Sequence, residues 1–420
     1  MPILIVGYLI AFLDRTNIGM AKEALEVDIG LTAASYGLGA GLFFAAYALL
    51  EVPSNLIMHR VGARFWIARI MLTWGIISMG MALVWNEWSF YAFRVLLGVA
   101  EAGFYPGVIL YLTFWFTRKD RARAIGLFLV GVSLANIIGA PLGGALLQMD
   151  GLLGLHGWQW MFIIEGVPAV LLAFFIWFKL PNGPSEAKWL SADDKALLTA
   201  ELAAEDDGAG SGAHGFKALL PVVKEPMVWL IIAIYFTHQV ASYLLHFFLP
   251  SIISSFDATM STLTVGFITA VPWIASAIGG LTLPKYGTTL RKQRAFVSGG
   301  LVVVAGGLLL AALSGGNLVV AMIGFILAAF WFFVIQSMLF TFPARLLSGA
   351  AVAAGIALIN TFGLLGGFLG PTIMGSLEAA TGNPLSGLWF VIILCAIGSA
   401  LALALRAKKE TVPVAGATIR

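Results

Sequence analysis

Twelve apolar stretches of about 20 residues run through the sequence, and each is long enough for an α-helix to cross the ~30 Å hydrocarbon core of a bilayer. Hydrophobic residues make up 60% of the chain and charged residues only 11%, whereas about a quarter of the residues of a water-soluble domain are charged. We therefore predict an all-α integral membrane protein with twelve transmembrane helices. The expected spans are 2–21, 36–58, 65–85, 88–116, 122–148, 158–180, 227–253, 262–284, 295–314, 317–342, 349–375 and 384–406.

A polar segment over 181–226 follows the sixth apolar stretch and divides the spans into two sets of six. We expect an N-terminal six-helix bundle at 1–180, a C-terminal six-helix bundle at 227–406 and a cytoplasmic tail at 407–420. The segment 181–226 is then a cytoplasmic linker that contains a short amphipathic helix. Because a glycine- and proline-rich run recurs in the fifth and eleventh spans, the halves form a weak parallel repeat, which is a recurrent architecture of membrane transporters.

The distribution of Lys and Arg predicts the orientation of the chain. If the N-terminus lies in the cytoplasm, nearly all of the 24 Lys and Arg residues fall in cytoplasmic loops, the linker or the tail. Only Lys22 then falls in an outer loop, while Arg15 and Arg94 lie inside spans. We therefore expect both termini in the cytoplasm. The apolar segment 1–20 lacks the basic region and the cleavage site of a signal peptide, so we interpret it as a retained first span and expect the native start to lie upstream of Met1.

Composition also excludes several classes of protein. One cysteine, Cys395, allows neither a disulfide framework nor a Cys-based metal site. A net charge of +3 without a basic tract argues against nucleic acid as a partner. His238 and His246 lack the i, i+4 spacing of helical metal ligands, and no nucleophile–base pair is recognisable. We predict no metal, no organic cofactor and no enzymatic activity.

Charged side chains inside the spans of the first half are the strongest functional signal in the sequence. Each costs about 2.5–3.5 kcal/mol at a helix centre, so these groups should face each other or a wet cavity. Arg94 and Glu101 are seven residues apart and stack on one face of span 4. Asp14 and Arg15 lie at a matching depth in span 1, which predicts one polar cluster between the two spans. The charged set is Asp14, Arg15, Glu51, Arg94, Glu101 and Glu165, of which we interpret Glu51 and Glu165 as mainly structural.

Such a cluster can link anion binding to proton binding. Burial raises the pKa of a carboxyl group, and a neighbouring arginine lowers it. If a substrate anion takes over the arginine, the carboxyl loses its counter-charge and binds a proton more readily, which couples the uptake of the two ions. The alternative is a static network of ion pairs that only aligns the helices.

In the second half we expect no charged side chain inside the spans apart from histidines. Gln239, Tyr243 and His246 fall at i, i+4 and i+7, on one face of span 7. This face fits a hydrogen-bonding wall for substrate hydroxyls, with hydrogen bonds between helices as the open alternative. Glycine pairs such as Gly37 and Gly41 are expected to permit close helix packing.

Several segments together resemble the major facilitator superfamily over nearly the whole chain. The loop Asn55-Leu-Ile-Met-His59-Arg60-Val-Gly62-Ala-Arg64 is similar to the signature loop that follows span 2 in that superfamily, and the resemblance implies a conformational role for it. The loop departs from the common pattern at His59, where an aspartate is usual. A charge-relay role therefore does not carry over to this position.

More narrowly, the chain resembles the anion:cation symporter family, which takes up organic anions with protons, and within it the carriers of tartrate, sugar acids and aromatic acids. The resemblance implies that Asp14 and Glu101 carry protons, that Arg94 is their switchable partner and that Arg15 binds a substrate carboxylate. It also implies hydrogen bonds to substrate from Tyr47 and Asn360. The matching segments are Leu13-Asp14-Arg15-Thr-Asn17, Glu51-Val-Pro53-Ser-Asn55, Phe93-Arg94-x6-Glu101-Ala-Gly103-x-Tyr105-Pro106-Gly107, Trp158-Gln-Trp160-x4-Glu165-Gly166 and Gly355-x4-Asn360.

The sequence thus predicts a proton-coupled transporter that imports a small organic anion by alternating access. We expect protons as the coupling ion, the lipid bilayer and the anion as partners, a monomer, and a bacterial cytoplasmic (inner) membrane as the location. One motif favours an alternative. The run Gly139-Ala-Pro141-Leu-Gly143-Gly144 in span 5 resembles a motif of drug:proton antiporters, which leaves a proton-driven exporter of drugs or metabolites as the second hypothesis.

Overall fold

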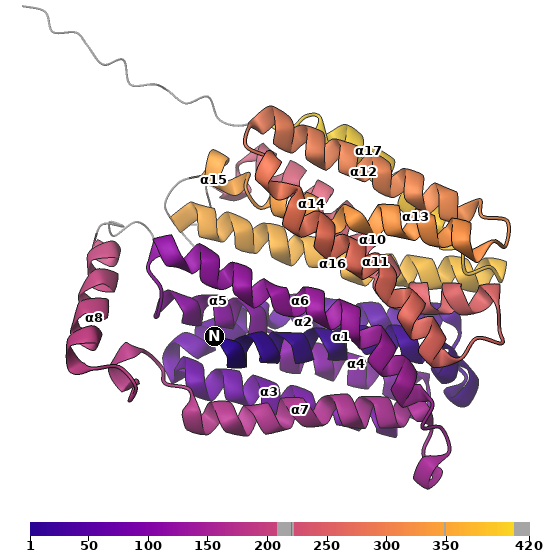
Figure 1. Cartoon of the computed structure of the whole chain (residues 1–420), viewed down its shortest axis with the longest axis horizontal. Coiled ribbons are helices and arrows are strands. Elements are labelled where there is room, and N and C mark those ends of the chain that lie inside the picture. The colour runs from indigo at the N-terminus through magenta and orange to yellow at the C-terminus, as the bar shows by residue number, and fades with distance from the viewer. Residues whose placement is uncertain (208–219, 221, 348–349, 407–420) are drawn as a thin grey trace, which may run out of the picture.

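The computed structural model describes residues 1–207, 220, 222–347 and 350–406, and every regular element in these ranges is an α- or 3-10 helix. Eleven helices are long and apolar enough to cross a membrane. A twelfth apolar helix, α17 (Ser386–Ala402), is shorter, with 17 residues. Figure 1 shows two bundles side by side, one built from α1 to α7 and the other from α10 to α17. The predicted all-α membrane fold is confirmed.

The first bundle contains the six predicted spans as seven helices. Capping boxes fix two of the helix starts, because Thr32 and Ser35 satisfy each other's backbone N–H at the start of α2, and Asn86 and Ser89 do the same at the start of α4. The helices are α1 (Pro2–Ile29), α2 (Ala33–Val61), α3 (Ala63–Gly80), α4 (Glu87–Glu101), α5 (Phe104–Thr113), α6 (Arg118–Leu147) and α7 (Gly157–Lys179).

Two of the predicted spans are broken. The span expected at 88–116 ends its first helix at Glu101, and Gly103 then adopts the left-handed conformation, with φ +89°, before α5 begins. The span expected at 317–342 breaks at Trp331 between α13 and α14. Hydropathy does not detect such breaks, because it registers apolar length and not backbone angles.

The second bundle comes after a short helix in the segment that joins the two bundles. The helix α8 (Ala192–Asp207) is the short linker helix, with the Ser191 hydroxyl accepting from the backbone N–H of Asp194 at its start. The tract Gly208–Gly215 and the tail 407–420 lie outside the described residues. The other helices are α10 (Pro226–Phe256), α11 (Thr262–Thr282), α12 (Leu290–Ala312), α13 (Leu318–Phe330), α14 (Phe332–Leu339), α15 (Pro343–Leu346) and α16 (Ala350–Thr381).

The two bundles are packed together most closely at the end of the molecule that is remote from the linker. We name the end that carries residue 1 and α8 the linker end, and the opposite end the distal end (Figure 1). Between the bundles, α2 packs on α16, α6 on α11 and α1 on α10. At Gly375 an added Cβ would lie 2.0 Å from the Ala33 carbonyl oxygen, and at Gly37 it would lie 2.2 Å from the Pro371 oxygen. Glycine is therefore required for this distal closure.

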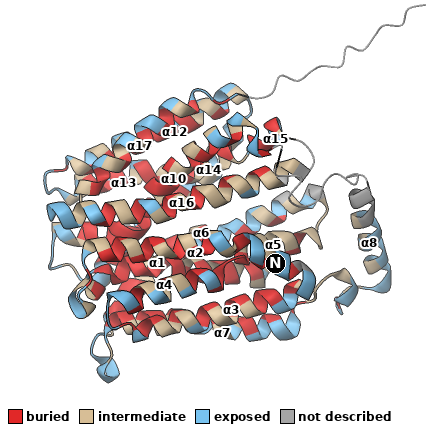
Figure 2. Cartoon of the chain, turned by 180° about the vertical axis from the view of Figure 1, so that it is seen from behind, coloured by how far each residue is buried: buried red, intermediate tan, exposed pale blue. Residues whose placement is uncertain are grey.

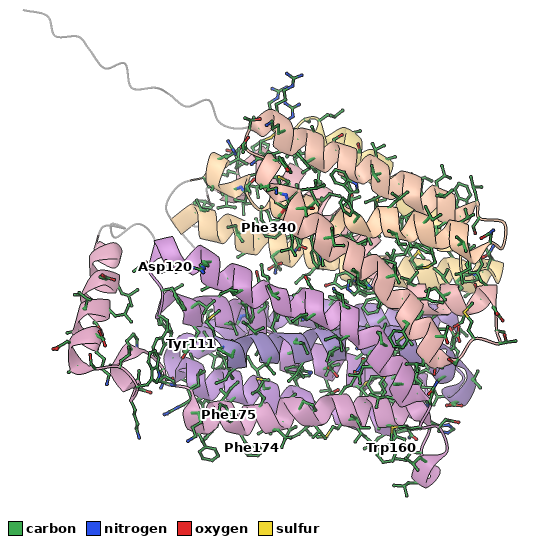
Figure 3. All side chains as sticks on the ribbon, viewed as in Figure 1. Tyr111, Asp120, Trp160, Phe174, Phe175 and Phe340 are labelled. Atoms are coloured by element: carbon green, nitrogen blue, oxygen red, sulfur yellow. The ribbon has the colours of Figure 1, made fainter. Side chains whose placement is uncertain are left out.

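Burial follows the bundle geometry. Figure 2 shows buried residues on the helix faces that are turned toward other helices and exposed residues on the outer surface. On α7, Phe174 and Phe175 are 52% and 47% exposed, and Figure 3 shows them on the outer side of the bundle. Large exposed apolar side chains on a membrane-spanning helix are matched to lipid. The charged set predicted inside the spans of the first half (Asp14, Arg15, Glu51, Arg94, Glu101 and Glu165), in contrast, is buried.

Candidate functional site

A charged cluster lies between α1 and α4, as the matching depths predicted. It comprises Asp14, Arg15, Arg94 and Glu101, each at most 6% exposed. The Arg15 guanidinium forms an ion pair with Glu101. Asp14 points to a different helix, because neighbouring residues on a helix differ by about 100° in direction. Its carboxylate accepts hydrogen bonds from the Trp74 indole N–H, at 2.7 Å, and from Ser78, both on α3.

Arg94 is not paired with either acid in the described residues of this conformation. Its guanidinium donates to the backbone oxygens of Gly39 and Ala40 on α2, each at 3.3 Å, and its Cζ lies 5.0 Å from the centre of the Phe43 ring. The cluster therefore contains one arginine that is bound to an acid and one that is bound to backbone. The second arginine is completely buried, and no ion pair to it is present within the described residues.

Three polar atoms of the cluster lack a hydrogen-bond partner within the described residues. They are Nε of Arg15, Nη1 of Arg94 and Oε2 of Glu101. Unpaired buried polar atoms are costly and call for an explanation, such as a ligand or a proton that is not present. The two guanidinium N–H groups are donors that suit a carboxylate, and the carboxylate oxygen is an acceptor that suits a proton.

Aromatic rings surround Arg15. Its Cζ lies 4.9 Å from the ring centre of Phe12, 5.3 Å from that of Phe43 and 5.2 Å from that of Tyr47. Such rings stabilise a buried cation without supplying a competing anion. They also leave the arginine available for an anionic ligand.

Tyr243 brings the second bundle to this arginine. Its ring lies 4.3 Å from that of Phe44, and its phenol group is close enough to the Arg15 guanidinium to interact with it electrostatically. Arg15 is therefore positioned at the interface between the two halves. Two of the predicted substrate-binding residues, Tyr47 and Tyr243, face it from opposite halves.

The other polar residues of α10 separate from Tyr243. The Gln239 amide oxygen lies 3.1 Å from Nδ1 of His238, whose Nε2 lies 2.9 Å from the Phe332 backbone oxygen. His246 contacts Asn136 of α6 through Nε2, at 3.1 Å. The residues of the predicted hydrogen-bonding wall thus include some that make contacts between helices, while Tyr243 lies beside Arg15.

Asn360 contacts an acid of the first half. Its Nδ2 donates to Glu51 at 3.2 Å, and the neighbouring Thr361 hydroxyl donates to the other oxygen of the same carboxylate at 3.1 Å. Glu51 is also within electrostatic range of Arg15. The residue predicted to bind substrate therefore links α16 to α2 in this conformation, on the linker side of the charged cluster.

The loop between α2 and α3 is anchored to the start of the linker. Gly62 has φ +90°, and the Arg64 backbone N–H donates to Asn182 at 3.0 Å. Asn182 also donates to Glu186 through its side chain and its backbone N–H, and these hydrogen bonds hold the pKa of Glu186 below its ordinary value. Among the predicted loop residues, Arg60 is exposed, Asn55 lies in α2 with its amide oxygen buried, and the His59 side chain lies outside the described residues.

Two predictions about charges are wrong. Lys22, expected in an outer loop, lies inside α1 and is 1% exposed. Glu378 lies inside α16, so the spans of the second half do contain an acid. Lys22 pairs with Glu378 at 2.8 Å and with Glu26 at 3.0 Å. The expected span 11 ended at residue 375. A hydropathy window detects only the apolar part of a helix, so it misses a polar extension of the same helix.

Two six-helix bundles in a membrane, with ionised groups buried at their interface, define the class of the molecule as a membrane transporter of small solutes. Residues 4–371 match the sequence profile of the family described as Major Facilitator Superfamily. The chain belongs to this family, which consists of transporters and not of enzymes.

Relatives of known description cover nearly the whole chain. A protein of Agrobacterium vitis that is provisionally described as a tartrate transporter is 41% identical over 404 residues, which are 96% of this chain and 89% of the relative. A quinolone resistance transporter of Acinetobacter baumannii is 41% identical over 413 residues, 97% of this chain and 93% of the relative. The inner membrane transport protein RhmT of Escherichia coli is 39% identical, with coverage of 97% and 94%.

Solved structures share the fold. A bacterial homologue of the human lysosomal transporter Spinster, in an inward-facing and occupied conformation, has a TM-score of 0.77 at 19% identity, with 96% of this chain and 95% of that chain covered. The inward-open xylose transporter XylE of E. coli has a TM-score of 0.74 at 13% identity, with coverage of 97% and 96%. These likenesses confirm the architecture.

Proposed function

We propose that the protein is a proton-coupled importer of a small organic anion, a tartrate-like hydroxy acid, a sugar acid or a related carboxylate. The observation that carries this proposal is the charged cluster. Within the part of the chain that the structure describes, two buried arginines each retain an unpaired donor and Glu101 retains an unpaired acceptor. An anion fits the donors and a proton fits the acceptor.

The ion pair between Arg15 and Glu101 supplies the coupling. An anion that binds the Arg15 guanidinium competes with Glu101 for the same positive charge. A buried carboxyl group that loses its counter-ion binds a proton more readily, so anion binding and proton binding promote each other. Asp14 is the second carboxyl group of the coupling site. Arg94 is the alternative ion-pair partner to which either acid can switch.

Substrate recognition is assigned to the two bundles together. Arg15 and Tyr47 face the anion from the first half, and Tyr243, with Gln239 beside it on α10, faces it from the second. Asn360 exchanges its present bond to Glu51 for one to substrate as the halves move. Rocking of the halves around this site gives alternating access, with a single chain as the transport unit.

The charges and the relatives support the proposed location and orientation. The excess of Lys and Arg at the linker end supports a cytoplasmic linker and cytoplasmic termini. The bacterial relatives support a cytoplasmic (inner) membrane as the location. With this orientation, the distal closure described above makes the present conformation closed to the outside.

A second candidate function is proton-driven export of a drug or metabolite. The quinolone resistance transporter of A. baumannii supports it, as does the Gly-Pro run of span 5. Two buried arginines repel a hydrophobic cation, whereas a substrate that carries a carboxylate suits them. The two functions therefore share the same recognition chemistry and differ in the direction of net flux.

Uptake into proteoliposomes tests the proposal. With an imposed proton gradient, we expect radiolabelled tartrate or another acid from a panel of hydroxy, sugar and aromatic acids to accumulate, and we expect a protonophore to abolish the accumulation. Arg15→Ala should abolish uptake of the same acid. Accumulation that needs no proton gradient would contradict the coupling, and drug resistance without uptake of any acid in the panel would favour export.

A further inference from the structure

A small cavity lies where four helices from both halves meet. Its volume is about 20 Å³, and its lining comes from α1 and α6 of the first half and from α10 and α11 of the second. The lining includes Asn17, Asn136, His246, Thr269 and Trp273. A water molecule needs about 10–15 Å³ of such space and two to four polar partners. The cavity therefore has room for one water.

Among the buried amide atoms that lack partners within the described residues, two belong to this lining. They are Oδ1 of Asn17, which is 3% exposed, and Nδ2 of Asn136, which is 4% exposed. One is an acceptor and the other a donor, so one water can donate to the first and accept from the second. A metal cation would satisfy the oxygen but would meet the amide N–H of Asn136 unfavourably. Water is the ligand that fits both.

Each amide is bonded on its other side to a titratable group. Asn17 donates through Nδ2 to Oε2 of Glu165 at 2.9 Å, and Oε1 of Glu165 lacks a partner in the described residues. Asn136 contacts Nε2 of His246 at 3.1 Å. The water would complete a chain from Glu165, in the first half, to His246, in the second.

The surroundings of Glu165 bear on whether it can take up a proton. It is 4% exposed, and the charged group that faces it from the packed helices is another acid, Asp14 on α1. No ion pair joins Glu165 to a cationic side chain within the described residues. A buried carboxyl without a cation is stabilised by taking up a proton. The His246 ring is tilted by 40° against that of Trp273, with the ring centres 3.9 Å apart. Its Nδ1 lies 2.8 Å from the Ser242 backbone oxygen, and the charged group near it is Arg15.

We propose that the cavity binds one water molecule, which joins Glu165 to His246 across the two halves, and that Glu165 is a further proton-binding residue whose charge acts on the distal closure. This proposal adds a proton site to the proposed function and rests on it for its role in transport. The chain of hydrogen bonds exists only while the two halves are closed at the distal end, because two of the cavity's four helices belong to each half.

The orientation of the Asn17 amide couples the protonation state of Glu165 to the water in the cavity. An ionised Glu165 only accepts hydrogen bonds, so Asn17 must turn its Nδ2 toward the acid and its oxygen toward the cavity. A protonated Glu165 also donates, which allows Asn17 to turn its oxygen toward the acid and its Nδ2 toward the cavity. The proton therefore changes which atom the water meets, and with it the strength of the contact between the halves.

The test measures distal closure without any substrate. Spin labels on Leu152→Cys and Ala380→Cys, which are exposed positions on opposite halves at the distal end, report the ratio of closed to open molecules as pH is changed. We expect Glu165→Gln to reduce the pH-dependent change relative to the unmodified residue. Asn17→Leu, which fills the cavity and removes the amide, should reduce it to a similar extent.

Two further variants make the result specific. The double variant Glu165→Gln/Asn17→Leu should show no greater loss than either single variant, because both act through one chain. Thr269→Val is the matched control, since its hydroxyl also lines the cavity but already donates to the Val265 oxygen at 2.8 Å. Its pH profile should be unchanged.

An unchanged profile in Glu165→Gln, or additive losses in the double variant, would overturn the proposal. Infrared spectra give an independent readout, because a protonated carboxylic acid has a carbonyl band that disappears in Glu165→Gln. Since no anion is added, these outcomes are distinct from a failure of anion uptake, which would overturn the proposed function and not this site.

Discussion

Lys22 and Glu378 form a salt bridge that joins the two halves at the distal end. They are 356 positions apart in sequence, and Nζ of Lys22 lies 2.8 Å from Oε1 of Glu378. The lysine side chain is 2% exposed and the glutamate side chain 15%. An alternating-access transporter must separate these groups each time its distal end opens, so the pair sets part of the energy difference between the two conformations.

Glu378→Gln is expected to favour the distally open conformation. Removing one partner of a buried charge pair costs about 2–5 kcal/mol, and because Lys22 keeps its bond to Glu26, we expect about 1.4 kcal/mol, a tenfold shift in the ratio of open to closed molecules. The Leu152/Ala380 spin-label pair measures this ratio. Glu26→Gln is the matched control, since it removes a charge from the same lysine within α1, and it should shift the ratio less than Glu378→Gln does.

Arg15→Lys is expected to weaken binding of the anion by about 10- to 100-fold, which corresponds to the loss of one charge-assisted hydrogen bond of about 1.5–3 kcal/mol. Lysine keeps the charge but lacks the planar fork whose Nε is unpaired. Thermal stabilisation of the purified variant by increasing anion concentrations gives the affinity. An affinity equal to that of the unmodified protein would remove Arg15 from the binding site.

Asp14→Asn is expected to abolish proton-driven accumulation while leaving exchange of anion across the membrane. The amide resembles a permanently neutral carboxyl, and its oxygen can still accept from Trp74. Counterflow in proteoliposomes measures exchange, and uptake under an imposed proton gradient measures coupling. Trp74→Phe removes the N–H donor but keeps the acid, so accumulation should persist in it. Full accumulation in Asp14→Asn would show that this carboxyl does not carry the proton.

Gly375→Val is expected to slow transport by preventing distal closure. Even the Cβ would lie 2.0 Å from the Ala33 oxygen, and backbone cannot move aside as a side chain can. Gly126→Val is the control, because its Cβ would have no neighbour within 4 Å, and it should transport at close to the normal rate. The initial rate of uptake and the spin-label distance together test this; equal rates in the two variants would argue against a need for close helix approach.

The spans could be predicted from the sequence because the bilayer imposes one length and one composition on them. Helix ends were less predictable. The helix α1 continues to Ile29, beyond the expected residue 21, and α16 includes Glu378. Both extensions are polar, and the Lys22–Glu378 pair makes them tolerable in the distal region. A hydropathy window includes the unfavourable free energy of burying a charged side chain. It does not include the salt bridge with a distant residue that offsets this free energy.

The composition of the charged cluster was predictable from depth, but its pairing was not. Residue spacing gives the height of Arg94 and Glu101 along one helix. It does not give the rotation of that helix against its neighbours, which decides that Glu101 pairs with Arg15 and that Arg94 bonds to the backbone of α2. The partners of Asp14 could not be predicted either. Trp74 and Ser78 belong to a span without charged residues at that depth, so the sequence gives no signal for them.

The break in span 4 places Glu101 at a junction between two helices. Glu101 is the last residue of α4, and the backbone turns at Ala102 and Gly103 before α5 starts. An intact helix resists bending because its backbone hydrogen bonds would have to be disrupted, whereas at this joint the ladder is already interrupted. Neutralising the Glu101 carboxylate therefore acts at a junction between two helices. At such a junction, a small change in local interactions can change the angle between α4 and α5.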